Sequence, residues 1–249
     1  MEEYPTKYIS PRLGRRLFDF VQDEEINLKN SLYDLAEELH FFDDLAEIYN
    51  GWLNQEQHLL EGESKYYALC SLARSNIYQA CSSYCRLHFS SAMVAARMAL
   101  DAAFYAEMMA RGYLSEDQYL NSQSKRTSLG RTAWAELKKG NDLGGRVRPI
   151  LTAMNTLSEH GAHPSPRTWA NRIMGEKSVA LSFFQNAKDS NHLKYHFLGI
   201  LWYGGMALES FLLIGREVFR QDIDHRLSML EEWKDRMETN KQKFGIWPS

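Results

Sequence analysis

Residues 197–215 read FLGILWYGGMALESFLLIG, an apolar run almost long enough to cross a membrane, which takes about 20 such residues as a helix. Glu209 and the pair Gly204-Gly205 lie near its centre, and the chain has no second run of comparable length. A charged side chain is costly inside a bilayer but tolerable inside a protein. We therefore expect this segment to be the buried central helix of a bundle, and we expect no membrane partner.

The remainder of the chain is also compatible with long helices. Its six prolines leave residues 12–148 and 167–247 without any, so the helical hydrogen-bond ladder can continue there. Apolar side chains within 30–60 recur at helical spacing and do not alternate as in a strand. These patterns predict an all-α fold of eight to ten helices.

Capping signals place some of the helix ends. Ser115 followed by Gln118 forms a capping box that opens a helix. Ser165-Pro166 predicts a helix over about 166–187, followed by a turn and a long apolar helix from about residue 191.

We expect one helical domain over residues 1–249, because 249 residues with 44% hydrophobic composition can enclose a single core. Within it we distinguish an acidic N-terminal region (1–63), a central core (64–187), and a final part (188–249) with the long apolar helix and a C-terminal amphipathic helix. Three cysteines and an N-terminus without an apolar leader favour reduced thiols and a cytoplasmic location.

Charge is unevenly distributed, although the whole chain carries only −3. Residues 19–63 hold thirteen acidic side chains against Lys29 alone, a net charge of −12, whereas residues 121–177 hold ten basic against four acidic ones, a net charge of +6. A polyanion would bind the second region, and we take its candidate nucleic-acid-binding residues to be Lys125, Arg126, Arg131, Arg146 and Arg148. Alternatively, the two regions are neighbouring faces that neutralise each other.

Arg97 and Asp101 form a charged pair on the otherwise apolar helix predicted over 90–113. They are one helical turn apart, so their side chains share a face. One interpretation is a buried or half-buried ion pair that fixes the register of the bundle. The functional interpretation is an arginine that binds phosphate and is oriented by the aspartate.

A second polar cluster occurs in LTAMNTLSEHGAHPSPR (151–167), where an amphipathic helix reaches Ser158, Glu159, His160 and His163 before Pro164 ends it. Histidine can act as a general acid or base near neutral pH. A capping or hydrogen-bonding role for His163 is the structural alternative.

Together the two segments resemble the HEPN helical domains of prokaryotes. The resemblance rests on the Arg97–Asp101 spacing and on GAHP at 161–164, and it covers roughly residues 64–187. It implies a helical bundle, frequently dimeric, of the kind found in toxins and phage-defence systems that cut RNA without a metal or other cofactor. His163 takes the position of the HEPN histidine.

The sequence departs from the HEPN pattern at one catalytic position. Active members carry an arginine a few residues before the histidine, whereas the corresponding positions at 155–158 hold none. RNA cleavage without a metal needs a proton-transfer group and a cation for the developing phosphate charge. The resemblance therefore implies either a catalytically degenerate RNA-binding protein or an active nuclease in which Arg97 or Arg148 replaces that arginine, with His163, Arg97 and Asp101 as the candidate catalytic residues.

Patterns for metal binding are incomplete. The segment FFDDLAE (41–47) is similar to the aspartate-rich motif of terpene synthases, but Pro149 stands where their second motif requires a ligating glutamate. His192 and His196 are one turn apart and supply only half of a metal site. We predict no metal and interpret the aspartates as part of an acidic helix face.

The alternative function is a non-enzymatic helical module that binds a protein partner or a second copy of itself. Its candidate surfaces are the acidic residues 19–63 and the apolar face of the C-terminal helix, formed by Leu227, Leu230, Trp233 and Met237. Neutralising the basic segment should abolish RNA binding but leave such a protein interaction unchanged.

Overall fold

The computed structural model describes residues 15–54, 62–124, 128–129, 131–132, 135, 142–159, 173–174, 180–181 and 190–244. This part of the chain contains eight helices, which confirms the predicted all-α fold and its helix count. The helices are α1 (Arg15–Asp34), α2 (Leu39–Leu53), α3 (Ser64–Cys85), α4 (Phe89–Ala110), α5 (Glu116–Asn121), α7 (Asp142–Leu157), α9 (Ser190–Val218) and α10 (Asp224–Gln242).

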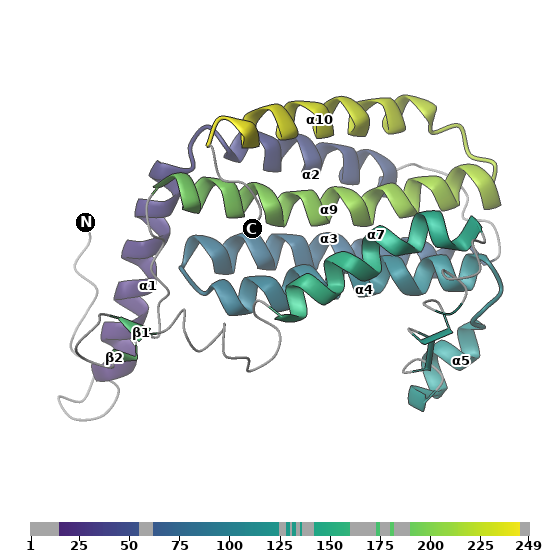
Figure 1. Ribbon diagram of the computed structural model, residues 1–249, viewed down its shortest axis with the longest axis horizontal. Coiled ribbons are helices and arrows are strands. Elements are labelled where there is room, and N and C mark those ends of the chain that lie inside the picture. The colour runs from purple at the N-terminus through teal and green to yellow at the C-terminus, as the bar shows by residue number, and fades with distance from the viewer. Residues whose placement is uncertain are drawn as a thin grey trace.

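Helix α9 is the centre of the bundle. It packs against α2 and α10 on one side and against α3, α4 and α7 on the other (Figure 1). By length and composition alone it could cross a membrane, but 67% of its most apolar window is buried inside the protein. Helix α9 therefore has the central buried position that its sequence predicts.

The glycine pair of α9 allows two helices to approach it closely. A Cβ at Gly204 would stand 3.0 Å from Leu45 of α2, and a Cβ at Gly205 would stand 2.6 Å from the ring of Trp233 on α10. Tyr49 of α2 donates a hydrogen bond of 2.8 Å to the carbonyl of Gly204. Side chains at these two positions would push α2 and α10 away from the core.

Helix α10 uses its apolar face inside the fold. Leu227, Leu230, Trp233 and Met237 are all buried, and the Trp233 indole N–H donates a hydrogen bond of 2.8 Å to the carbonyl of Phe41. The suggestion that this face meets a partner is therefore wrong, because these side chains already pack within the bundle.

Two predicted helical segments differ from the structure. The stripe over 30–60 belongs to two helices, since α1 ends at Asp34 and α2 begins at Leu39. The helix expected over 166–187 is wrong at the four residues described there, because Ile173–Met174 (β1) and Ala180–Leu181 (β2) form a short antiparallel pair. Backbone bonding between these two pairs replaces the helical pattern that Ser165-Pro166 suggests.

The predicted capping box is present at the start of α5. The Ser115 hydroxyl accepts a hydrogen bond from the Gln118 N–H at 3.1 Å, and the Gln118 side chain accepts one from the Ser115 N–H at 3.1 Å. This reciprocal pair satisfies backbone donors that the first turn leaves unbonded.

Candidate functional site

Helix α4 opens to solvent along one stripe in its first two-thirds. Val94 and Met98 are 38% and 48% exposed, and Arg97 and Asp101 lie between and beside them on the same face. Most other residues of α4 are buried, because α3, α7 and α9 surround the helix. The stripe is therefore the part of α4 that a ligand can reach.

Arg97 and Asp101 are half-buried within this stripe, with side-chain exposures of 31% and 33%. Arg97 Nε lies 3.9 Å from Asp101 Oδ2, which is the long end of ion-pair distances. Burial raises the pKa of Asp101 from its ordinary value, and the charge of Arg97 partly offsets this rise. The predicted pairing is present; Arg97 Nε is buried, and about a third of each side chain is exposed.

Helix α7 packs against α4 and runs in the opposite direction. The chain therefore leaves α7 at Leu157 over the first half of α4, the half that contains Arg97 (Figure 1). The Ser158 hydroxyl donates a hydrogen bond of 2.7 Å to the backbone carbonyl of Met154. This side-chain bond lies just beyond Leu157, the last residue of α7. His163 lies outside the described residues.

The predicted basic segment is only partly described. Arg131 and Arg148 are exposed, and Arg146 belongs to α7, while Lys125 and Arg126 lie outside the described residues. Exposed guanidinium groups can bind phosphate at little desolvation cost. Arg148 lies in the first half of α7, whereas the opposite end of this helix, at Leu157, lies over the half of α4 that contains Arg97.

The acidic region pairs with other parts of the protein. Glu38 lies 3.4 Å from Lys194 of α9, and Asp44 lies 2.8 Å from Arg236 of α10. No ion pair joins residues 19–63 to 121–177 in the part of the chain that the structure describes. The described contacts thus do not support mutual neutralisation of the two regions.

The described residues contain no group of three or more histidine, cysteine or acidic side chains placed to hold a metal ion. The His192 and His196 rings are 6.4 Å apart at the surface of α9, with no third ligand described beside them. Cys70, Cys81 and Cys85 are buried core residues, and burial raises the pKa of the Cys85 thiol to about 11.

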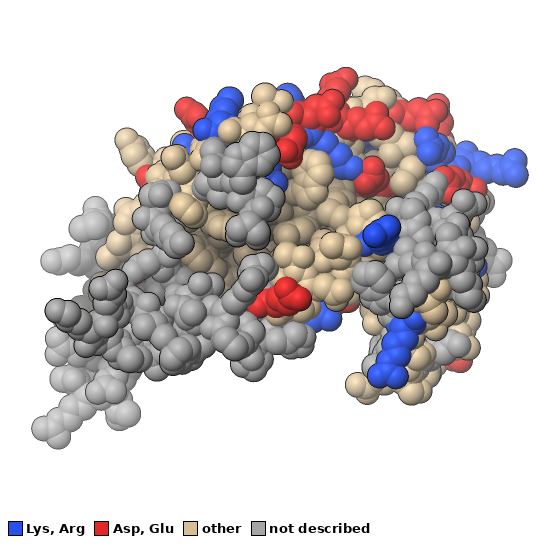
Figure 2. All heavy atoms as spheres, in the orientation of Figure 1, with Lys and Arg blue, Asp and Glu red and all other residues tan. Residues whose placement is uncertain are grey.

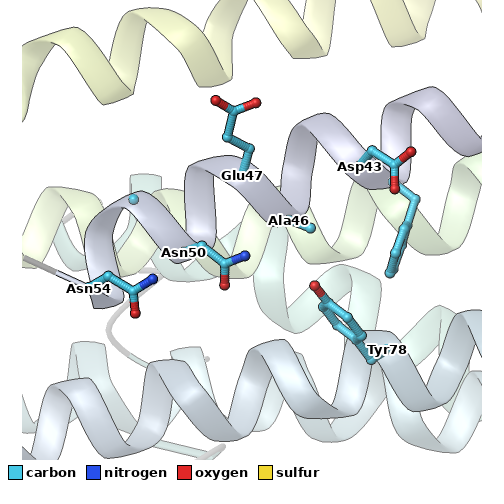
Figure 3. A pocket seen from close by; sticks show the side chains of 8 residues that line it. Asp43, Ala46, Glu47, Asn50, Asn54 and Tyr78 are labelled. Carbon is cyan, nitrogen blue, oxygen red and sulfur yellow. The ribbon is translucent and has the colours of Figure 1, made fainter.

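A groove of about 520 Å³ runs along α2, and part of its lining comes from the FFDDLAE segment, for which the sequence predicts only an acidic helix face. Figure 3 shows Asp43, Glu47, Asn50 and Asn54 following one another along α2. Tyr78 of α3 faces α2 beside Ala46 and Asn50, whereas the Glu47 carboxylate points away from Tyr78. Phe42, Ala46 and Gly51 complete the lining. In the space-filling view, acidic and basic side chains alternate along the neighbouring α10 edge of the molecule (Figure 2).

Comparison of the chain with protein-family models, with curated proteins and with solved structures finds no match.

Proposed function

We propose that this chain is a HEPN-like cytoplasmic protein of a bacterial defence or toxin-like system that binds RNA and is either a metal-independent nuclease or a degenerate relative of one. One observation carries the proposal: the apolar helix α4 exposes a single stripe, and Arg97 and Asp101 lie together within it. Their half-buried position also fits an ion pair that fixes the register of the bundle, and the RNA test below distinguishes the two functions.

The chemistry assigned to this region divides between binding and proton transfer. The Arg97 guanidinium binds an RNA phosphate. Asp101 orients this guanidinium through the attraction between their opposite charges. His163 acts as the general acid or base, as the HEPN resemblance implies. Arg148, exposed on α7, is the second candidate for stabilising charge that develops on the phosphate.

We further propose that the protein forms a homodimer, in keeping with the same resemblance. The stripe on α4 supplies a support for this, because Val94 and Met98 expose apolar surface next to the charged pair. A second copy placed there would cover these side chains and bring two Arg97 side chains near each other.

A helical interaction module is the second candidate function, and helix α1 favours it. Leu17, Val21 and Tyr33 are 66%, 43% and 85% exposed, while the acidic side chains of Asp19 and Asp23 lie on the same helix. Exposed apolar side chains on a projecting helix suit a protein contact better than a polyanion.

The test is incubation of purified protein with mixed RNA, with and without EDTA. Wild type, Arg97→Ala and His163→Ala are compared with Arg216→Ala, which removes an arginine that is 45% exposed and far from α4 in sequence. Cleavage that survives chelation, persists in Arg216→Ala and disappears in the other two variants supports an active nuclease. Retention of RNA without cleavage, lost in Arg97→Ala, supports the degenerate form, whereas absence of both cleavage and retention at low salt contradicts the proposal.

A further inference from the structure

Helix α2 already binds an arginine side chain from α10 through a carboxylate and an aromatic ring. Arg236 donates a hydrogen bond of 2.8 Å to Asp44, and its guanidinium carbon lies 5.9 Å from the centre of the Phe41 ring. Phe41 and Asp44 are three residues apart and share a face of α2. Phe42 and Asp43 lie between them in sequence and line the groove instead.

Two more arginines of the chain lie against this helix. Arg74 of α3 donates a hydrogen bond of 2.5 Å to the side-chain oxygen of Asn50. The guanidinium of Arg226 lies beside Gly51, with Nη1 3.3 Å from the place where a Cβ would stand. Side chains of α2 thus accept hydrogen bonds from two guanidinium groups, those of Arg236 and Arg74.

The groove along α2 also offers carboxylates and aromatic rings, and no described arginine or lysine side chain lines it. Asp43 and Glu47 are exposed one turn apart, and no described residue forms an ion pair with either of them. Phe42 and Tyr78 form an edge-to-face pair, 4.8 Å between ring centres, at the side of the groove. Two neighbouring carboxylates repel each other, and a bound cation would relieve that repulsion.

We propose that this groove binds an arginine-bearing segment of a partner protein, with Asp43 and Glu47 binding its guanidinium groups and Phe42 and Tyr78 packing against them. A guanidinium fits this set better than an ammonium, because its planar fork pairs with a carboxylate while its face packs on an aromatic ring. The groove is open to solvent and is not an enclosed cavity, which suits a chain segment more than a small enclosed ligand.

The net charge of the region agrees with a basic partner. Residues 19–63 carry thirteen acidic side chains against one lysine, so a cationic segment is attracted and a nucleic acid is repelled. The proposal goes beyond the RNA function and does not depend on it, because the groove lies on α2 and the Arg97 stripe lies on α4.

The experiment measures binding of a fluorescein-labelled peptide of alternating arginine and glycine to the full chain by fluorescence anisotropy at low ionic strength. We compare the double variant Asp43→Asn/Glu47→Gln with Glu231→Gln/Asp235→Asn, which removes the same charge from exposed positions one turn apart on α10, outside the groove. The groove variant should weaken binding by about fivefold or more, and the α10 variant should change it by less than about twofold.

A second pair of variants tests the aromatic side of the groove. Tyr78→Ala should reduce the preference for the arginine peptide over a lysine counterpart, whereas Tyr113→Ala, at a side chain that is 37% exposed after α4 and outside the groove, should preserve it. Absence of peptide binding by the wild type, or equal weakening by the two acidic double variants, would overturn the proposal. Circular dichroism spectra that match wild type establish that each variant is folded.

Discussion

Replacing Gly205 by alanine tests the packing of α10 on α9. The added Cβ would stand 2.6 Å from Cζ3 of Trp233 and 3.1 Å from Cη2, closer than side-chain atoms approach in folded proteins. The ring cannot easily move, because Trp233 is fully buried and its indole N–H is bonded to Phe41. Overpacking of this kind costs about 1–3 kcal/mol, against which the better helix propensity of alanine returns roughly 0.8–1 kcal/mol. We expect a net loss of about 0–2 kcal/mol, so that Gly205→Ala is less stable than the same change at an open position of the helix.

Gly199 provides a matched control on the same helix, since no described atom lies within 4 Å of the Cβ that alanine would add there. Gly199→Ala should stabilise the protein by about 0.5–1 kcal/mol through helix propensity alone. The assay is urea unfolding followed by circular dichroism. The unfolding free energies of the two variants are compared where the slope of free energy against urea concentration is the same for both. A stability of Gly205→Ala equal to that of Gly199→Ala would refute the close approach of α9 and α10.

The remaining predictions concern a turn, the thiols and pH. Gly112 has a φ of +75° in the turn after α4, so Gly112→Ala should lower the unfolding free energy of the protein by about 1 kcal/mol in urea unfolding. An unchanged unfolding free energy would contradict the left-handed turn. None of the three cysteines should react quickly with Ellman's reagent at neutral pH until guanidinium unfolds the protein, because all are buried and the pKa of Cys85 is about 11; a fast-reacting native thiol would contradict this. Burial raises the pKa of Asp101, so the wild type should lose stability relative to Asp101→Asn as the pH rises from the ordinary carboxyl pKa through the raised pKa. Thermal unfolding at a series of pH values measures this difference. The opposite trend with pH would mean that the pKa of Asp101 is lowered.

The fold could be predicted largely from local patterns. Proline positions, helical spacing of apolar side chains and the Ser115 capping box depend on neighbours within a few residues, and the structure confirms the all-α bundle and the capping box. The central place of α9 also followed from composition, because an apolar helix with a buried glycine pair needs other helices around it.

Features that depend on distant residues could not be predicted. Asp43 and Asp44 are identical neighbours, yet Asp44 bonds to Arg236, 192 residues away, while Asp43 faces a groove. The apolar face of α10 has the same pattern as a docking face, and only its contact with α2 and α9 shows that it is internal. The spacing of Arg97 and Asp101 predicts a shared face, whereas their exposure depends on where α3, α7 and α9 pack.

Retention of RNA by the purified protein, titrated with salt, tests the central claim most directly. The variant for comparison has glutamine at five basic positions: Lys125, Arg126, Arg131, Arg146 and Arg148. We predict that wild type retains RNA at low salt, that its affinity falls as salt rises by a slope of about −0.7 per phosphate contacted, and that the variant loses both affinity and slope. Absence of RNA retention by the wild type at low salt, or an unchanged slope in the variant, would contradict the RNA function.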